Sequence, residues 1–138
     1  MSQRILLIED NQTDIDLTRR AFSKIANGYS LEAIDDGQDA LDYLLASGSH
    51  LPQLILLDLK MPRTGGLEVL AAIRKNERTR HIPVVILTSS AEQRDITAAY
   101  DLGANSYICK PVDYSIFVET LQCLVKYWFE ISHLPTPG

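Results

Sequence analysis

The sequence lacks the features that mark several large classes of protein. It has no apolar run long enough to span a membrane, and the apolar stretch in its opening residues, MSQRILLIED, is too short for a signal peptide. It also has no excess of basic charge, because 13 Lys and Arg residues stand against 18 Asp and Glu residues. The net charge of −5 argues against non-specific nucleic-acid binding. These absences favour a cytoplasmic protein that engages neither membrane nor nucleic acid.

Cysteine is also scarce. Cys109 and Cys123 show neither metal-ligand spacing nor a disulfide framework, so we expect both to pack as small apolar side chains in a reducing compartment. The length of 138 residues suits one domain with one core. We expect residues 1–138 to form a single domain, in which 127–138 extend the last helix and end in a short tail. The prolines and glycine of HLPTPG cannot continue a helix.

Short apolar runs alternate with amphipathic stretches along the whole chain. The expected strands are RILLIE (4–9), YSLEAI (29–34), QLILLD (53–58), PVVILT (83–88) and SYICK (106–110). Asn11 and Asp36 are placed to cap the first two helices, and NG at 27–28 is expected to end the first, which includes Ile25. Ser90 and Gln93 have the spacing of a capping box before a helix that ends at Gly103.

Five repeats of strand and helix predict an α/β fold with a parallel sheet that helices cover on both faces. The first, third and fourth strands are the most apolar, so we expect them in the centre of the sheet. The second strand alternates and the fifth is short and polar, so both are expected at the edges. The strand order 2-1-3-4-5 of the flavodoxin-like fold satisfies these constraints.

Polar residues follow four of the predicted strands. Glu9 and Asp10 end the first strand, Asp58 the third, Thr88 the fourth and Lys110 the fifth. In an open parallel sheet these strand ends lie on one rim, where ligands bind. The three acids need a counter-charge, and their oxygen atoms favour a hard cation such as Mg²⁺ or Mn²⁺ beside Lys110.

This combination of residues is suited to phosphoryl transfer. Asp58 is the candidate nucleophile because it ends the central strand, while Lys110 and Thr88 can contact phosphoryl oxygens. Each residue alone has an ordinary alternative: Asp10 can cap a helix, Thr88 can cap a turn and Lys110 can be a solvated charge. Their joint placement on one rim favours the site.

The chain resembles the response-regulator receiver domains of bacterial two-component systems over residues 4–126. The resemblance is carried by IED at 8–10, LLDLKMPRTGG at 56–66, LTSS at 87–90 and CKP at 109–111. It implies that Asp58 accepts a phosphoryl group, that Glu9, Asp10, Asp58 and the backbone carbonyl of Lys60 surround the metal, and that Thr88 and Lys110 contact the phosphoryl group. Such a protein is a signalling protein that catalyses only its own phosphorylation and slow dephosphorylation.

The resemblance also implies a switch. Thr88 moves toward the phosphoryl group and Tyr107 turns inward, which changes the face built from the fourth helix, the fifth strand and the fifth helix. Without the surrounding motifs, Tyr107 is more simply a half-buried edge-strand residue with its hydroxyl in water. The peptide bond between Lys110 and Pro111 is expected to be cis, as in family members.

The resemblance implies that the phosphoryl donor is a sensor histidine kinase. His50, His81 and His133 lie in loops or the tail and are expected at the surface. No effector domain follows the receiver pattern, so we expect a stand-alone regulator with an unidentified downstream protein. The length and KYWFEISHLP resemble the small regulators that serve cyanobacterial phytochrome kinases.

The end of the last helix is rich in apolar residues. Trp128 is expected to continue the core stripe, whereas Tyr127, Phe129 and Ile131 fall on other faces. These four residues, with the face described above, predict a homodimer; the alternative is a monomer with an exposed apolar tail.

Two other functions are compatible with the same fold. A phosphatase that turns over through an aspartyl phosphate needs a second acid two residues after its nucleophile, but Lys60 occupies that position. A flavin or nucleotide carrier needs a glycine-rich or hydroxyl-rich first loop, but here that loop is EDNQTD.

Overall fold

The computed structural model describes residues 3–25, 28–110 and 113–135. Its strands are β1 (Gln3–Ile8), β2 (Tyr29–Ile34), β3 (Leu54–Leu57), β4 (Val84–Thr88) and β5 (Ser106–Cys109). Its helices are α1 (Gln12–Phe22), α2 (Gly37–Leu45), α3 (Gly66–Lys75), α4 (Gln93–Asp101) and α5 (Tyr114–Lys126), which continues into the π-helical segment η1 (Tyr127–Ile131). The sheet is parallel with the order β2-β1-β3-β4-β5, as predicted.

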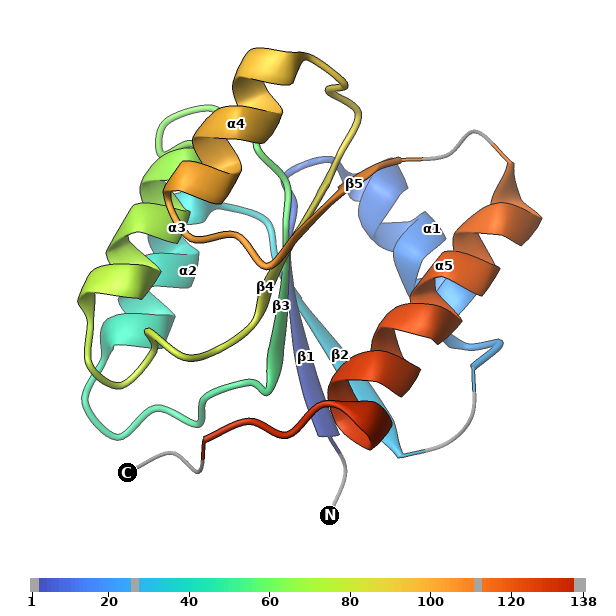
Figure 1. Ribbon diagram of the computed structural model, residues 1–138, viewed down its shortest axis with the longest axis horizontal. Helices are drawn as coiled ribbons and strands as arrows, with labels where there is room; N and C mark the ends of the chain where they lie inside the picture. Colours follow the sequence, from blue (N-terminus) through green and yellow to red (C-terminus); the bar gives the residue numbers. More distant parts are fainter. Residues whose placement is uncertain (1–2, 26–27, 111–112, 136–138) are drawn as a thin grey trace.

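The sheet divides the core into two layers (Figure 1). Helices α1 and α5 cover one face, and α2, α3 and α4 cover the other. Successive residues of β1 supply the two layers in turn: Ile5 and Leu7 face α1 and α5, whereas Leu6 and Ile8 face the other layer. All four residues of β3 are buried, and each buried Leu or Ile contributes roughly 1.5–3 kcal/mol of hydrophobic stabilisation. This burial fixes the central strand that ends at Asp58.

Helix α1 is shorter than predicted. Asn11 caps it as expected, since its side chain accepts a hydrogen bond from the Asp14 N–H. The predicted end at NG was wrong, because α1 ends at Phe22. The Ser23 hydroxyl donates to the carbonyl of Arg20, and the following N–H groups bond three residues back, which tightens the chain into turns. Asn27 lies outside the described residues.

Caps at the other helices agree with the sequence in part. Asp36 caps α2 through the Asp39 N–H, as predicted. The capping box of Ser90 and Gln93 was wrong, because α4 begins at Gln93 and its N-cap is Glu92. The Ser90 hydroxyl instead donates to Asp95 and accepts from the N–H of Glu92, one residue before the helix begins. Gly103 has a positive φ of 102° just after α4, where a helix end favours glycine.

The last helix does not continue as a regular α-helix. Its final turn is the π-helical segment η1, in which Phe129 stacks on Tyr29 with ring centroids 5.2 Å apart. Trp128 packs against the α1–α5 layer of the core, as expected, and Phe129 packs there too. Tyr127 and Ile131 remain 49% and 55% exposed, so the apolar surface here is smaller than the sequence predicted.

The two cysteines are exposed, so the prediction that both pack in the core was wrong. Cys109 lies at the end of the edge strand β5, and Cys123 lies on the solvent side of α5. His50, His81 and His133 are exposed, as expected.

Candidate phosphoacceptor site

Backbone hydrogen bonds continue past the strand ends and bring the polar residues to one rim. The N–H of Glu9 donates to Ile34, that of Asp58 to Ile8 at 3.0 Å, and that of Lys110 to Thr88 at 2.8 Å. Because each residue is tied to the neighbouring strand, its side chain leaves the sheet at the same edge. The predicted convergence of β1, β3, β4 and β5 on one site is therefore present.

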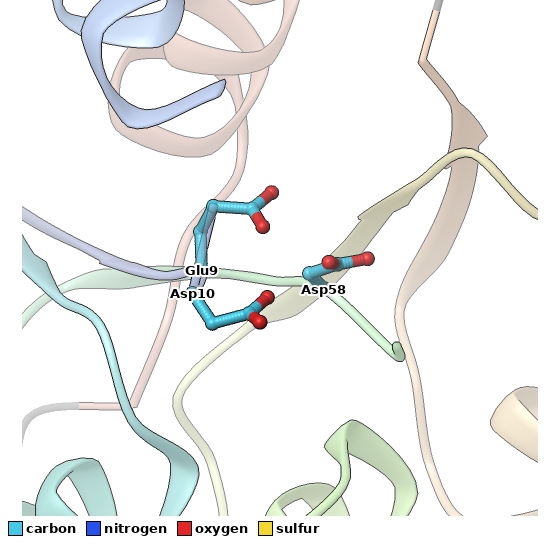
Figure 2. A group of neighbouring side chains, drawn as sticks. All are labelled: Glu9, Asp10 and Asp58. Atoms are coloured by element: carbon cyan, nitrogen blue, oxygen red, sulfur yellow. The ribbon is translucent and has the colours of Figure 1, made fainter. Parts of the chain in front are cut away.

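Glu9, Asp10 and Asp58 form an acidic group at this rim (Figure 2). One carboxylate oxygen from each lies within 4.8 Å of the others. Glu9 and Asp58 are only 2% and 5% exposed, while Asp10 is the least buried of the three. Burial raises the pKa of Glu9 from 4.5 to about 7; the Lys110 hydrogen bond opposes this rise and the nearby Asp58 charge adds to it.

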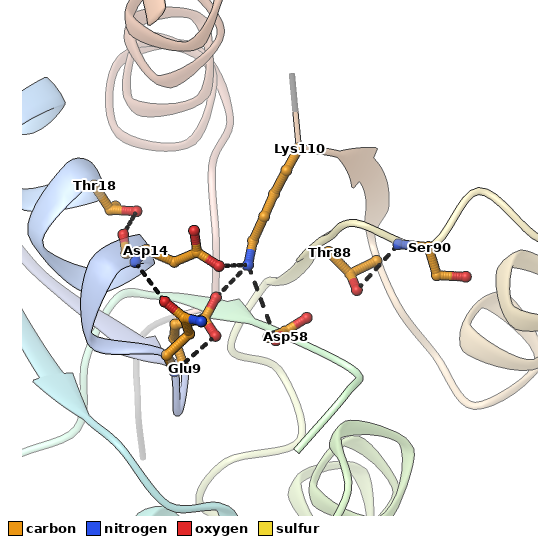
Figure 3. Close-up of polar contacts among 8 residues, drawn as sticks. Glu9, Asp14, Thr18, Asp58, Thr88, Ser90 and Lys110 are labelled. Atoms are coloured by element: carbon orange, nitrogen blue, oxygen red, sulfur yellow. Dashed lines mark hydrogen bonds and ion pairs between the residues drawn. The ribbon is translucent and has the colours of Figure 1, made fainter. Parts of the chain in front are cut away.

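Lys110 supplies the positive charge of the site (Figure 3). Its Nζ donates to Glu9 and, at 2.8 Å, to Asp14, and it lies 3.9 Å from Asp58 Oδ2. Burial alone would lower the pKa of Lys110, but the hydrogen bonds to Asp14 and Glu9 and the charge of Asp58 outweigh it, so the pKa is raised. The side chain therefore remains protonated and cationic at neutral pH.

Asp58 is held in place but not fully satisfied. Its Oδ1 is buried and has no hydrogen-bond partner among the described residues. The loop after it is pressed against α3, since a Cβ at Gly66 would lie 2.3 Å from the Asp58 carbonyl oxygen. Arg63, in the left-handed region with φ of 60°, forms an ion pair with Asp36 that ties the loop to α2. A buried carboxylate oxygen without a protein partner is unusual, and it suits a residue that binds a cation or a substrate.

The residues around Asp58 fit a divalent cation. All three candidate ligand atoms are carboxylate oxygens, which Mg²⁺ and Mn²⁺ accept readily, and Asp58, which contributes one of them, has an oxygen without a protein partner among the described residues. Histidine and cysteine contribute nothing to the described group, which is unlike the ligand set of zinc. The backbone carbonyl of Lys60 as a further ligand remains a prediction.

A second set of contacts links the acceptor loop to α4. The Lys60 Nζ lies 3.2 Å from Asp95 Oδ2, to which the Ser90 hydroxyl donates at 2.5 Å. The Tyr107 hydroxyl donates to the Ser90 carbonyl at 2.9 Å, so it is not simply in water. Thr88 is fully buried, and its Oγ1 lies 3.5 Å from the Ser90 N–H that donates to it. The Lys60 side chain thus faces α4.

The sequence interpretation missed two residues of the site, Asp14 and Asp95. Asp14 lies in the first turn of α1, directly after the strand end that carries Glu9 and Asp10, and its place three residues after the expected cap Asn11 was the available signal. Asp95 gives no such signal, because its partner Lys60 is 35 positions away in sequence.

The predicted cis bond between Lys110 and Pro111 lies outside the described residues, which stop at Lys110 and resume at residue 113. In the part of the chain that is described, no helix has both the length and the apolar character needed to cross a membrane.

Comparison with known proteins agrees with this geometry. The family model described as "Response regulator receiver domain" matches residues 5–122. A probable methanogenesis regulatory protein of Methanothrix harundinacea, FilR2, is 40% identical over 137 residues, which are 97% of this chain and 88% of that protein. Response regulator Rcp1 of Synechocystis sp. is 35% identical over 135 residues, which are 95% of this chain and 92% of Rcp1.

Solved structures give the same result. The crystal structure of Mn²⁺-bound Rcp1 superposes with a TM-score of 0.86 at 35% identity and covers 97% of this chain and 99% of that one. The phosphorylated cyanobacterial phytochrome response regulator RcpA superposes with a TM-score of 0.90 at 34% identity, over 99% of this chain and 100% of that one. The chain belongs to the response regulator receiver domain family.

Proposed function

We propose that the protein is a signalling switch in which Asp58 accepts a phosphoryl group from a sensor histidine kinase. The observation that carries this proposal is the setting of the Asp58 carboxylate. It is buried, has one unpartnered oxygen, lies beside the carboxylates of Glu9 and Asp10, and faces an ammonium group 3.9 Å away. A nucleophile in this setting is oriented, is kept from bulk water and lies next to a positive charge.

The proposed transfer is a direct displacement. A carboxylate oxygen of Asp58 forms a bond to phosphorus while the bond between phosphorus and the donor's histidine nitrogen breaks. The electron pair of that bond stays on the imidazole nitrogen, which then takes a proton from solvent. Lys110 and Thr88 donate hydrogen bonds to the phosphoryl oxygens, and Glu9, Asp10, Asp58 and the Lys60 carbonyl hold Mg²⁺ or Mn²⁺. When bound, the cation offsets the negative charge of the phosphoryl oxygens.

The output of the switch is proposed to pass through Ser90. Thr88 and Tyr107 both bond to this residue, one through its N–H and the other through its carbonyl. If Thr88 turns toward a phosphoryl group, the Ser90 N–H loses its hydrogen-bond acceptor. The loop before α4 can then shift, and with it the face of α4, β5 and α5 that binds an unidentified downstream protein.

A kinase of the phytochrome type is the proposed donor. The similarity to Rcp1 and RcpA supports it, because RcpA is described as a phytochrome response regulator. FilR2 has a higher sequence identity to this chain but is a probable methanogenesis regulatory protein. The phytochrome proposal therefore rests on the likeness in fold and site to RcpA and Rcp1, and not on the degree of sequence identity. Such kinases form phosphohistidine from cytoplasmic ATP, so the proposal places this protein in the cytoplasm.

A homodimer through the α4–β5–α5 face and η1 is part of the proposal. Tyr127 and Ile131 are half exposed at its edge, whereas Trp128 and Phe129 are partly covered by their own chain. Light scattering of the protein at high concentration tests this part. A mass that stays that of one chain would contradict it.

The proposed function is tested with acetyl phosphate, a small phosphoryl donor. The protein is incubated with the donor and Mg²⁺, and intact mass is measured. We expect one phosphoryl group on the wild type and none on Asp58→Asn, which keeps the size of the side chain. An excess of EDTA should abolish the adduct. No adduct on the wild type, or an equal adduct on the variant, would overturn the proposal.

A further inference from the structure

We propose that Asp14 is a positioning residue that fixes Lys110 for phosphoryl transfer. This inference rests on the function proposed above. A lysine ammonium has three N–H donors. In the structure one donates to Glu9, a second donates to Asp14 at 2.8 Å, and Asp58 lies 3.9 Å from the same nitrogen. With two donors held by carboxylates, the third is left for the side on which Asp58 lies (Figure 3).

Asp14 is itself firmly held. It lies in the first turn of α1, where its N–H donates to the Asn11 side chain at 3.0 Å. Its carbonyl accepts a hydrogen bond from the buried Thr18 hydroxyl at 2.8 Å. Both ends of the Asp14 backbone are therefore fixed, and its carboxylate reaches Lys110 from the α1 side (Figure 3). A carboxylate on an anchored stretch of backbone can set the direction of a flexible lysine side chain.

The distance between Lys110 and Asp58 indicates how the hydrogen bond between Lys110 and Asp14 affects phosphoryl transfer. At 3.9 Å the ammonium is too far from Asp58 Oδ2 for a hydrogen bond, although both groups are charged and nearly buried. Asp14 and Glu9 hold the ammonium at this separation. The nucleophile consequently keeps its lone pairs, and the gap can be occupied by a phosphoryl oxygen that accepts from Lys110. Without Asp14, the strong attraction between Lys110 and Asp58 would be free to close the gap.

If the Asp14 side chain were shortened, no neighbouring protein group that lines the hollow beside it would take over as a fixed acceptor for Lys110. A hollow of about 60 Å³ lies beside it, lined by Leu17, Thr18, Lys110 and Phe117 as well as Asp14 itself. This volume admits water, so a shortened side chain would leave Lys110 bonded to a mobile solvent molecule and not to a fixed carboxylate. Removal of a negative charge would also weaken repulsion of an anionic donor. The proposal therefore predicts opposite effects on the maximal rate and on donor binding.

The test compares Asp14→Ala, Asp14→Asn and the control Asp16→Ala. Asp16 lies on the same helix and is exposed, and its side chain bonds only to the Gln12 side chain among the described residues. With saturating Mg²⁺, the rate of phosphorylation by acetyl phosphate is followed by intact mass and extrapolated to saturating donor. We expect about a tenfold lower maximal rate for Asp14→Ala and about threefold for Asp14→Asn, which keeps an acceptor oxygen. The half-saturating donor concentration should not rise.

A double variant separates positioning from a general structural role. If Asp14 acts through Lys110, Asp14→Ala should change the rate by less than about twofold when Lys110→Met is already present. A full tenfold loss in that background would overturn the proposal. So would an Asp14→Ala protein that is phosphorylated as fast as the wild type, since Asp14 would then only repel the donor.

A readout without phosphorylation keeps the two proposals distinct. In ¹⁵N-labelled protein the ammonium of Lys110, held by two carboxylates, should exchange slowly enough with water to be observed by NMR. Asp14→Ala should lose this signal and Asp16→Ala should keep it. If the wild type takes no phosphoryl group but the signal behaves in this way, the proposed function fails while the contact stands. If the signal persists in Asp14→Ala, the positioning role is refuted whatever the phosphorylation result.

Discussion

Glu9 should make the metal-free protein less stable at neutral pH than at mildly acidic pH. Its side chain is nearly buried next to Asp58, and its pKa is raised from 4.5 to about 7, mainly because burial penalises the charged form. Between these two values the folded protein binds a proton that the unfolded chain has released. The free energy of unfolding therefore falls as pH rises through this interval.

The size of the effect follows from the two pKa values. Each pH unit between 4.5 and about 7 lowers the free energy of unfolding by about 1.4 kcal/mol, so the full decrease approaches about 3 kcal/mol. Glu9→Gln cannot ionise and keeps an oxygen that can accept from Lys110. We expect the variant to match the wild type near pH 4.5 and to be more stable by about 2–3 kcal/mol at pH 8.

The measurement is urea unfolding in EDTA across this pH range, with Glu68→Gln as the control. Glu68 is exposed on α3, so its replacement should leave the pH dependence unchanged. Added Mg²⁺ should stabilise the wild type more than Glu9→Gln, because a bound cation favours the ionised acids. A Glu9→Gln protein that is less stable than the wild type at pH 8 would refute the reasoning. The ion pair with Lys110 would then outweigh burial.

Three further changes test how the scaffold supports the site. Gly66→Ala should lower the free energy of unfolding by about 1–3 kcal/mol and slow phosphorylation of Asp58, because the added methyl group meets backbone atoms. The control Gly65→Ala, where an added methyl group has its nearest contact at 3.8 Å, should change neither the unfolding curve nor the phosphorylation rate measured by intact mass. Arg74→Met should lower the free energy of unfolding by about 2–4 kcal/mol without slowing phosphorylation. Arg74 donates to three backbone carbonyls and to the Asn105 side chain, all far from the rim. An unchanged midpoint in urea unfolding would contradict this. Phe129→Ala should lower the thermal midpoint through loss of the Tyr29 stack, and a stable variant would show that η1 is not anchored there.

The fold could be predicted from the sequence because each strand carries a strong local signal. Leu54 to Leu57 are four successive apolar residues with no polar face, which favours a central strand, and the alternation in Tyr29–Ile34 favours an edge strand. The helix ends were less predictable, since they depend on side chains that can bond in more than one way. Ser90 has the spacing of a cap but bonds to Asp95 on α4. The π-helical turn at the end of α5 has no signal in the sequence pattern that we used.

The site was predictable to the extent that it is made of strand ends. Glu9, Asp10, Asp58 and Lys110 each lie within two residues of a strand end, so topology alone brings them together. Asp14 was missed because it lies on a helix, where an acid in the first turn is ordinarily explained by the helix dipole. The contact of Lys60 with Asp95 was missed because only the folded chain brings the acceptor loop beside α4.

The most direct test of the central claim is to locate the phosphoryl group on the chain. After incubation with acetyl phosphate and Mg²⁺, the acyl phosphate is reduced with borohydride and the protein is digested for peptide mass spectrometry. We predict a single modified position, Asp58, and no modification at Asp10 or Glu9, which share the rim but not its central strand. A phosphoryl group on either of those acids, or on a histidine, would contradict the account.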